Sequence, residues 1–284
     1  MTGMVRRPEN GSPPSGADAT DPKHAPEPAE VAVPKDAATV VLLREGPRGP
    51  EVFLQRRVTG MAFAGGMTVF PGGGVDPRDA DASVSWTGPD AGWWAHRFGC
   101  SAEQARALVC AAVRETFEES GVLLAGPDAG SVVADTGAYG TARAALISRE
   151  VSLAAFLAEE GLVLRADLLR PWSNWLTPEA EPRRYDTRFF LAAMPGGQRA
   201  DARTTEAAEA YWRTPAEALA DADAGRSRLL PPTRTTLAEV DACGGIEAAL
   251  AVERGIAKVL PKLVRVDDRW EVVLPGEPGY QEAR

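Results

Sequence analysis

Residues 114–122 read Arg-Glu-Thr-Phe-Glu-Glu-Ser-Gly-Val, and this stretch says more about the fold than any other part of the chain. Upstream of it, Ser101-Ala-Glu-Gln104 has the form of a helix capping box. Apolar residues then recur with helical spacing until Gly121, a residue type that commonly follows the last turn of a helix. The pattern predicts a helix over about residues 102–120.

On such a helix Glu115 and Glu119 lie one turn apart, and Glu118 lies beside them. The three carboxylates repel one another and also sit at the helix C-terminus, where the helix dipole disfavours anions. A divalent cation such as Mg²⁺ or Mn²⁺ would reverse both costs, because hard oxygen ligands are the ones it prefers. The alternative is a solvated acidic face on which Arg114 and Glu118 form an exposed pair.

Together with the glycine-rich turn upstream, the stretch resembles the Nudix box, G-x5-E-x7-R-E-U-x-E-E-x-G-U, in which U is aliphatic. Gly73 and Asp79 are spaced as in the first half, and residues 114–122 match the second half at its fixed positions. Phe70-Pro-Gly-Gly73 matches the strand and loop that enter the box. The sequence departs from the pattern in three ways. Asp79 replaces Glu, Thr116 replaces an aliphatic residue, and 34 residues rather than 7 separate the halves.

The long insertion resembles the Nudix branch that includes peroxisomal coenzyme A diphosphatases. Four less specific segments also look like that branch, and the resemblance covers roughly residues 38–275. These segments are 63–73, 175–178, 183–190 and 230–233.

The resemblance implies hydrolysis of a nucleoside diphosphate linked to another group, with Mg²⁺ or Mn²⁺ as the cofactor. It implies that Glu115, Glu118 and Glu119 are metal ligands and that Glu118 and Glu119 are catalytic. Gly73 is expected to let the backbone approach metal or phosphate closely, since a Cβ there would obstruct it. Arg114 is expected to orient the carboxylates, and the shorter Asp79 puts its own orienting role in question.

The general base is left open between a box carboxylate and a later one, for which Glu206 is the candidate. An exposed loop or edge-strand acid is the competing interpretation of Glu206 and Glu209. Arg56 and Arg184 are candidate substrate contacts, because forked guanidinium groups suit phosphate oxygens. Their neighbours Arg57 and Arg183 are candidates too, with surface solubility as the alternative for these arginines.

The rest of the chain predicts an α/β fold, and the resemblance specifies a Nudix α/β/α sandwich. Residues 1–36 are rich in Pro, Gly and Ser and are predicted to be a disordered leader. Residues 37–284 are expected to form the domain, with an insertion at about 80–100 and a C-terminal extension at about 231–284. Strands are predicted over 38–44, 51–56, 67–70, 187–193, 264–266 and 270–274, and further helices over 143–160, from 215, and over 233–242 and 246–258.

Three tryptophans in the insertion, Trp86, Trp93 and Trp94, are expected to pack against the body, with stacking on an adenine as the alternative. Cys110 is expected to pack as well. With three cysteines and no CxxC pair, the sequence predicts neither a disulfide framework nor a zinc ribbon.

The charge and hydropathy of the chain argue against nucleic-acid and membrane partners. Lys and Arg total 31 against 40 for Asp and Glu, so the net charge of -9 argues against a nucleic-acid-binding regulator. No apolar run is long enough to span a bilayer, and the N-terminus lacks an apolar secretion segment. We therefore expect a cytoplasmic protein with a small nucleoside diphosphate derivative as substrate and no nucleic acid or membrane partner. A homodimer is a candidate assembly. Coenzyme A or an acyl-CoA is the favoured substrate, and a nucleotide sensor that binds without turnover is the alternative function.

Overall fold

The computed structural model describes residues 31–281, with gaps at 62–63, 202–203, 205–206 and 267–268. The predicted leader therefore lies largely outside the described residues. The first strand begins at Lys35, two residues before the expected start of the domain.

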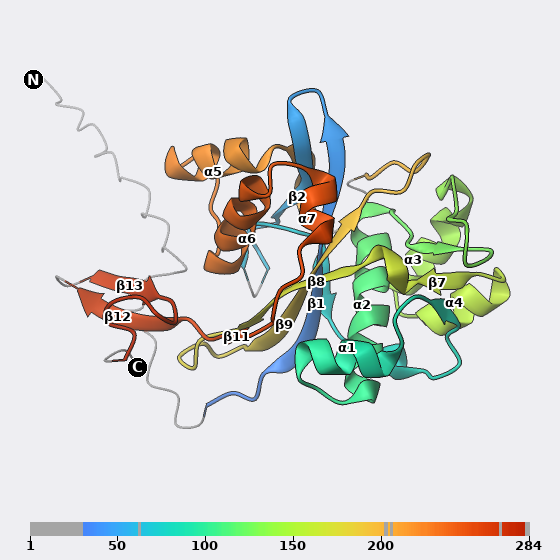
Figure 1. The fold of residues 1–284 in the computed structure, drawn as a ribbon, viewed down its shortest axis with the longest axis horizontal. Helices are drawn as coiled ribbons and strands as arrows, with labels where there is room; N and C mark the ends of the chain where they lie inside the picture. The colour runs from blue at the N-terminus through green and yellow to red at the C-terminus, as the bar shows by residue number, and fades with distance from the viewer. Residues whose placement is uncertain (1–30, 62–63, 202–203, 205–206, 267–268, 282–284) are drawn as a thin grey trace, which may run out of the picture.

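A mixed eight-stranded sheet forms the centre of the described part of the chain (Figure 1). Its main path runs β10-β2-β1-β9-β8-β11, while β3 pairs with β2 and β4 pairs with β1. Strand β1 is parallel to β9 and antiparallel to β2. The strands are β1 (Lys35–Gly46), β2 (Gly49–Arg57), β3 (Thr68–Val69), β4 (Gly72–Gly74), β8 (Arg170–Leu176), β9 (Tyr185–Ala193), β10 (Ala207–Arg213) and β11 (Lys258–Val259).

The apolar side chains of β1 alternate between two cores, as the two-residue period of a strand requires. Ala38, Val40 and Leu42 belong to one core, and Val41 and Leu43 belong to the other. Because both faces of β1 are buried, its sequence is a continuous apolar run rather than an alternating one.

Helices cover each of these faces, so the fold is an α/β/α sandwich, as the sequence predicted (Figure 1). One layer contains α1 (Ala91–Phe98), α2 (Ala102–Ser120), α3 (Gly140–Ile147) and α4 (Leu153–Glu159). The other contains α5 (Pro215–Asp223), α6 (Pro231–Ala242) and α7 (Ile246–Ala251). The C-terminal extension thus supplies most of the second layer, and its β11 also joins the sheet.

Asp79, the end of the first half of the box, lies on a 3-10 turn, η2 (Pro77–Ala80). The insertion that follows forms the short strand β5 (Trp86–Thr87), helix α1 and the first turns of α2. Trp94 on α1 is fully buried and packs near Phe98 and Phe190, so its expected packing role is confirmed. Trp86 is half-buried beside Arg106, and Trp93 is 41 % exposed. Strand β5 joins β6 (Ala125–Gly126) and β7 (Val163–Arg165) in a small separate sheet.

Two helix predictions were too long. The pattern over 143–160 is two helices, because the chain turns at Arg149 in a left-handed conformation and Ser152 caps a new helix. The pattern over 246–258 ends at Ala251, since Val252 is extended and residues 258–259 pair with β8. The capped starts of α2 at Ser101 and α5 at Thr214 are confirmed.

Strands β8 and β10 were not predicted. β8 carries Pro171 and a register shift near it, which hides the periodicity of a buried strand. A hairpin of β12 (Lys262–Val266) and β13 (Arg269–Val273) ends the chain, close to the predicted strand positions. Within the described ranges, no helix is both long and apolar enough to cross a membrane.

Candidate active site

Helix α2 carries the box carboxylates at its C-terminal end and begins and ends where its caps predict. The Ser101 side chain accepts a hydrogen bond from the Gln104 amide, which satisfies a free N–H of the first turn. Gly121 ends the helix at a φ of 74°, and its amide donates to the Phe117 carbonyl. A Cβ at Gly121 would also lie 2.9 Å from Nη1 of Arg143, so the position favours glycine twice.

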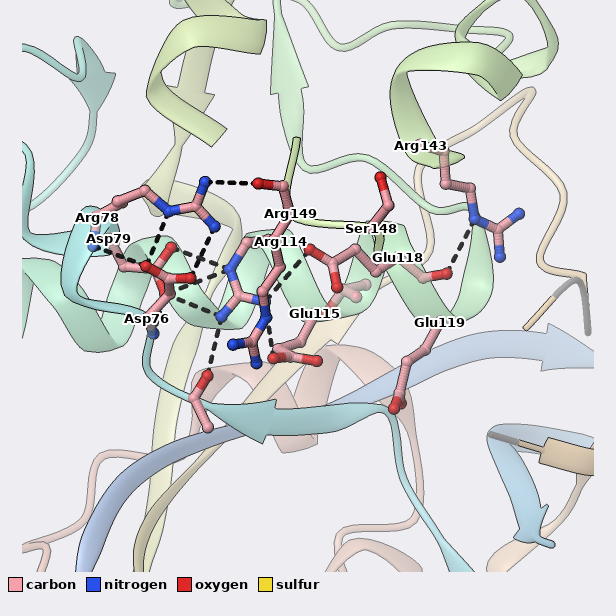
Figure 2. A network of polar contacts seen from close by, with 12 residues as sticks. Asp76, Arg78, Asp79, Arg114, Glu115, Glu118, Glu119, Arg143, Ser148 and Arg149 are labelled. Atoms are coloured by element: carbon pink, nitrogen blue, oxygen red, sulfur yellow. Dashed lines mark hydrogen bonds and ion pairs between the residues drawn. The ribbon is translucent and has the colours of Figure 1, made fainter. Parts of the chain in front are cut away.

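A buried ion pair joins the two halves of the box across the insertion. Arg114 donates from Nε and Nη2 to the Asp79 carboxylate at 3.0 and 2.9 Å (Figure 2). Asp79 is only 3 % exposed, and it also accepts the Asp76 amide at 2.8 Å. The shorter side chain therefore still reaches Arg114 in the bidentate geometry that guanidinium and carboxylate favour.

The same guanidinium holds two of the three box glutamates. Nη1 of Arg114 donates to Glu115 Oε1 at 2.8 Å and to Glu118 Oε1 at 3.2 Å. Its Nη2 also donates to the Gly74 carbonyl at 2.9 Å. These bonds use Arg114 fully, so the expectation that it orients carboxylates rather than binding substrate agrees with its contacts. The alternative interpretation, an exposed Arg114–Glu118 pair on a solvated face, is wrong, since the two side chains are 11 % and 13 % exposed.

Glu119 is held separately, on the side of the helix that faces the sheet. Its Oε2 accepts the Gly72 amide at 2.9 Å and the Gln55 side-chain amide at 3.1 Å. Both donors come from the sheet, so Glu119 is fixed against β2 and β4. Gln55 is 2 % exposed and was not anticipated; a single Gln within a strand pattern gives no signal of its partner.

Gly73 lies against the carboxylate of Glu115. A Cβ built on Gly73 would lie 2.6 Å from Cδ and from both carboxylate oxygens of Glu115. The structure therefore gives a different steric reason for glycine here: a side chain would occupy the place that a box carboxylate takes. The expected close approach of the backbone to metal or phosphate stays a prediction.

Gly73→Ala should displace the Glu115 carboxylate and lower the activity of a site built on it by about 10-fold or more, because small misplacements of catalytic groups are costly. Gly74→Ala is the matched control, since nothing lies within 4 Å of a Cβ there. Steady-state kinetics of the two variants checks this. Equal activity of both would show that the close approach to Glu115 has no catalytic consequence.

The box carboxylates do not all converge in this arrangement. Among the residues that the structure describes, no group of three or more His, Cys, Asp or Glu side chains has metal-binding geometry. Glu115 and Glu118 face Arg114 (Figure 2). Glu119 instead accepts hydrogen bonds from Gln55 and Gly72. The donor chemistry nevertheless fits a hard divalent cation, because the last two turns of α2 carry three carboxylates and one of them, Glu115, lies where a Cβ on Gly73 would collide with it.

Burial makes these carboxylates resist ionisation. It raises the pKa of Glu115 to about 7, although Arg114 acts in the opposite direction. Burial likewise raises the pKa of Glu118, again against the effect of Arg114. A cation that stabilised the ionised carboxylates would lower both values.

The raised pKa of Glu115 should make the metal-free protein less stable as pH rises. The folded state holds a proton between the ordinary pKa of 4.5 and about 7, so this contribution is complete below pH 4.5 and disappears above pH 7. We expect the free energy of unfolding in EDTA to fall by about 3 kcal/mol between pH 5 and 8. Urea unfolding of wild type and Glu115→Gln measures it; an identical pH slope in both would contradict the assignment.

A cation from outside the helix offsets the charge at its C-terminus. Arg143 on α3 is buried, donates from Nε to the Glu118 carbonyl at 3.0 Å, and pairs with Asp201 at 2.8 Å. Helix α2 has no basic residue in its own last turn. Arg143 supplies the positive charge that the helix dipole favours there. This contact could not be predicted from local sequence patterns, because it joins residues 25 positions apart.

The other candidate residues lie away from the brace of the box, which is the ion-pair network of Arg114 with Asp79, Glu115 and Glu118. Arg56 points outward and pairs with Glu209 on the edge strand β10 at 3.2 Å, with both side chains about half exposed. Arg184 is buried and donates to the carbonyls of Thr177 and Ala32 at 3.0 Å each. These bonds give Arg184 a structural role, and the structure does not bring it to the carboxylates. Glu206 lies outside the described residues.

The three cysteines are free thiols, as expected. Cys110 on α2 is fully buried in the core, and burial raises its pKa to about 12. It therefore packs, as predicted, and has none of the character of a reactive thiolate.

The α/β/α sandwich and the braced carboxylate helix define a Nudix hydrolase. The family model described as the NUDT19 Nudix domain matches residues 95–239, just over half of the chain. The chain belongs to the Nudix family of hydrolases, and the domain that it matches is that of NUDT19.

Individual relatives agree. Nudix hydrolase 7 of Caenorhabditis elegans is 30 % identical over 207 residues, which are 70 % of this chain and 57 % of that protein. Acyl-coenzyme A diphosphatase NUDT19 of Xenopus laevis is 26 % identical over 274 residues, which are 82 % and 72 % of the two chains. The crystal structure of a Nudix hydrolase from Alicyclobacillus acidocaldarius is similar with a TM-score of 0.64 at 28 % identity, covering 78 % of this chain and 98 % of that one.

Proposed function

We propose that the protein is a divalent-metal-dependent diphosphatase that cleaves coenzyme A or an acyl-CoA. The observation that carries the proposal is the set of three glutamates at the C-terminal end of α2: Arg114, paired with Asp79, holds Glu115 and Glu118, and Glu115 lies against Gly73. Its substrate part is supported by the match to the NUDT19 domain and by the Xenopus relative, which is named as an acyl-CoA diphosphatase.

Glu115, Glu118 and Glu119 would hold Mg²⁺ or Mn²⁺, which when bound neutralises diphosphate charge and lowers the pKa of water. The chain's own residues prepare this site. Arg114 restrains Glu115 and Glu118, and the Gly72 amide and Gln55 orient Glu119.

Water then attacks one phosphorus of the anhydride, the bridging P–O bond breaks, and two phosphate monoesters leave. The proton of the attacking water passes to a carboxylate: Glu118 or Glu119 of the box, or Glu206.

Arg56 is a less suitable phosphate contact, since Glu209 already neutralises it. Cytoplasmic location and a homodimer remain predictions from the sequence.

The test is hydrolysis followed by chromatography of the two phosphate monoester products, with Mg²⁺ and Mn²⁺ separately and EDTA as control. The panel contains coenzyme A, an acyl-CoA, ADP-ribose, NADH and a nucleoside triphosphate. Metal-dependent cleavage of a CoA compound in preference to the others is the expected result. Cleavage of ADP-ribose or NADH instead would refute the substrate, and metal binding without turnover of any compound would favour the alternative of a nucleotide sensor.

A further inference from the structure

Arg149 occupies a position that usually belongs to glycine. Helix α3 ends in a Schellman motif, in which the Glu150 amide donates to the Ala145 carbonyl and the Arg149 amide to the Leu146 carbonyl, both at 2.9 Å. Arg149, which follows the end of the helix in this motif, has a φ of 61°. Left-handed backbone is strained for a residue with a Cβ, and such residues occur preferentially at functional sites.

The turn at Arg149 is fastened to the brace of the box. Nη1 of Arg78 donates to the Arg149 carbonyl at 3.1 Å, and Nη2 of Arg78 pairs with Asp76 at 2.8 Å (Figure 2). Asp76 in turn donates its amide to Asp79, the partner of Arg114. One chain of contacts therefore positions both the carboxylates and the backbone from which the Arg149 side chain extends.

The guanidinium of Arg149 extends toward the carboxylates. Figure 2 shows its side chain reaching past Glu118 and Arg114, and its charge lowers the pKa of Glu118 against the larger, opposite effect of burial. Arg149 is exposed, and within the described part of the chain its guanidinium makes no hydrogen bond or ion pair. Arg114 is occupied by four residues and Arg56 by Glu209, so neither has the same freedom to bind an anion.

We infer that Arg149 binds the diphosphate group of the substrate at the box, with its fork of donors directed at phosphate oxygens. This inference rests on the proposed function and adds the residue that recognises the anion. Guanidinium suits phosphate because two parallel N–H bonds match two oxygens. The rigid turn fits this role, since a pre-positioned side chain loses less freedom when it binds.

The test is Arg149→Gly, which removes the side chain and also relieves the left-handed backbone. Its Tm should equal or exceed that of wild type, while kcat/KM should fall about 10- to 100-fold, the loss expected for hydrogen bonds to a charged group. Arg149→Lys should recover only part of this loss. The control is Glu150→Ala in the same turn, where the side chain is exposed and activity should not change.

Comparing coenzyme A with dephospho-coenzyme A locates the contact. Equal losses in Arg149→Gly for both compounds assign Arg149 to the diphosphate. A loss confined to coenzyme A would overturn the inference, because it would place Arg149 at the additional phosphate.

Calorimetry with ADP in Ca²⁺ separates this inference from the proposed function. Weaker ADP binding by Arg149→Gly than by wild type supports the contact even if wild type cleaves no CoA compound, in which case only the proposed function fails. Unchanged ADP binding and kcat/KM in a folded Arg149→Gly protein would overturn the inference alone. A wild-type protein that neither binds ADP nor cleaves the panel would overturn both.

Discussion

Glu118→Gln should abolish metal-dependent turnover, with a loss on the order of 10³-fold or more in kcat. The substitution keeps the shape of the side chain and one oxygen that can still accept from Arg114, which lies 3.2 Å away. What it removes is the negative charge that would help hold a divalent cation. The loss should therefore appear in kcat and in metal affinity, measured by kinetics across Mg²⁺ concentrations and by calorimetry.

The same variant should be as stable as wild type in EDTA, or slightly more so. It removes one of three carboxylates from the C-terminal end of α2, where like charges and the helix dipole are both unfavourable. Glu103→Gln on the exposed first turn of α2 is the matched control and should retain activity. If Glu118→Gln turned over at the wild-type rate while folded, Glu118 would have no part in the mechanism.

The elements that the sequence predicted best are those whose signals are local. Helix α2 has a serine cap, a continuous apolar face and a terminating glycine, and it runs from Ala102 to Ser120 as expected. The two-helix segment was misjudged because one residue, Arg149, breaks it. Arginine seldom adopts a left-handed backbone conformation, so the residue type at position 149 does not predict the end of the helix.

The features of the candidate site also fall into two groups: those set by local sequence and those that depend on contacts between distant residues. The spacing of the glutamates is a property of one helix, so sequence could predict it. The reason for glycine at 73 is a contact with Glu115 on α2, which only the folded structure shows. The partners of Glu119 and of the helix C-terminus come from elsewhere: Gln55 lies 64 positions from Glu119, and Arg143 lies 25 positions from Glu118. Such pairs exist only once the sheet and α3 are assembled.

Arg114→Met should cost about 3–5 kcal/mol of stability, because it removes the common partner of several buried carboxylates. Asp79, Glu115 and Glu118 all bond the guanidinium, and their side chains are 2 %, 12 % and 13 % exposed. Without it they keep their burial but lose compensation. For a domain of this size the loss corresponds to a fall in Tm of roughly 10–15 °C.

The mechanism behind that loss makes it depend on pH. Unpaired buried carboxylates can be relieved by protonation, so the destabilisation should be smaller at pH 5 than at pH 8. Urea unfolding in EDTA at both pH values measures this.

Asp79→Asn combined with Arg114→Met should destabilise by less than the sum of the single variants, since the two residues share one interaction. Arg106→Met, on the same helix and beside Trp86, should cost about 1 kcal/mol or less. Equal losses at the two pH values, or equal losses for Arg114→Met and Arg106→Met, would mean that packing of the aliphatic stem matters at this position rather than the charge that organises the box.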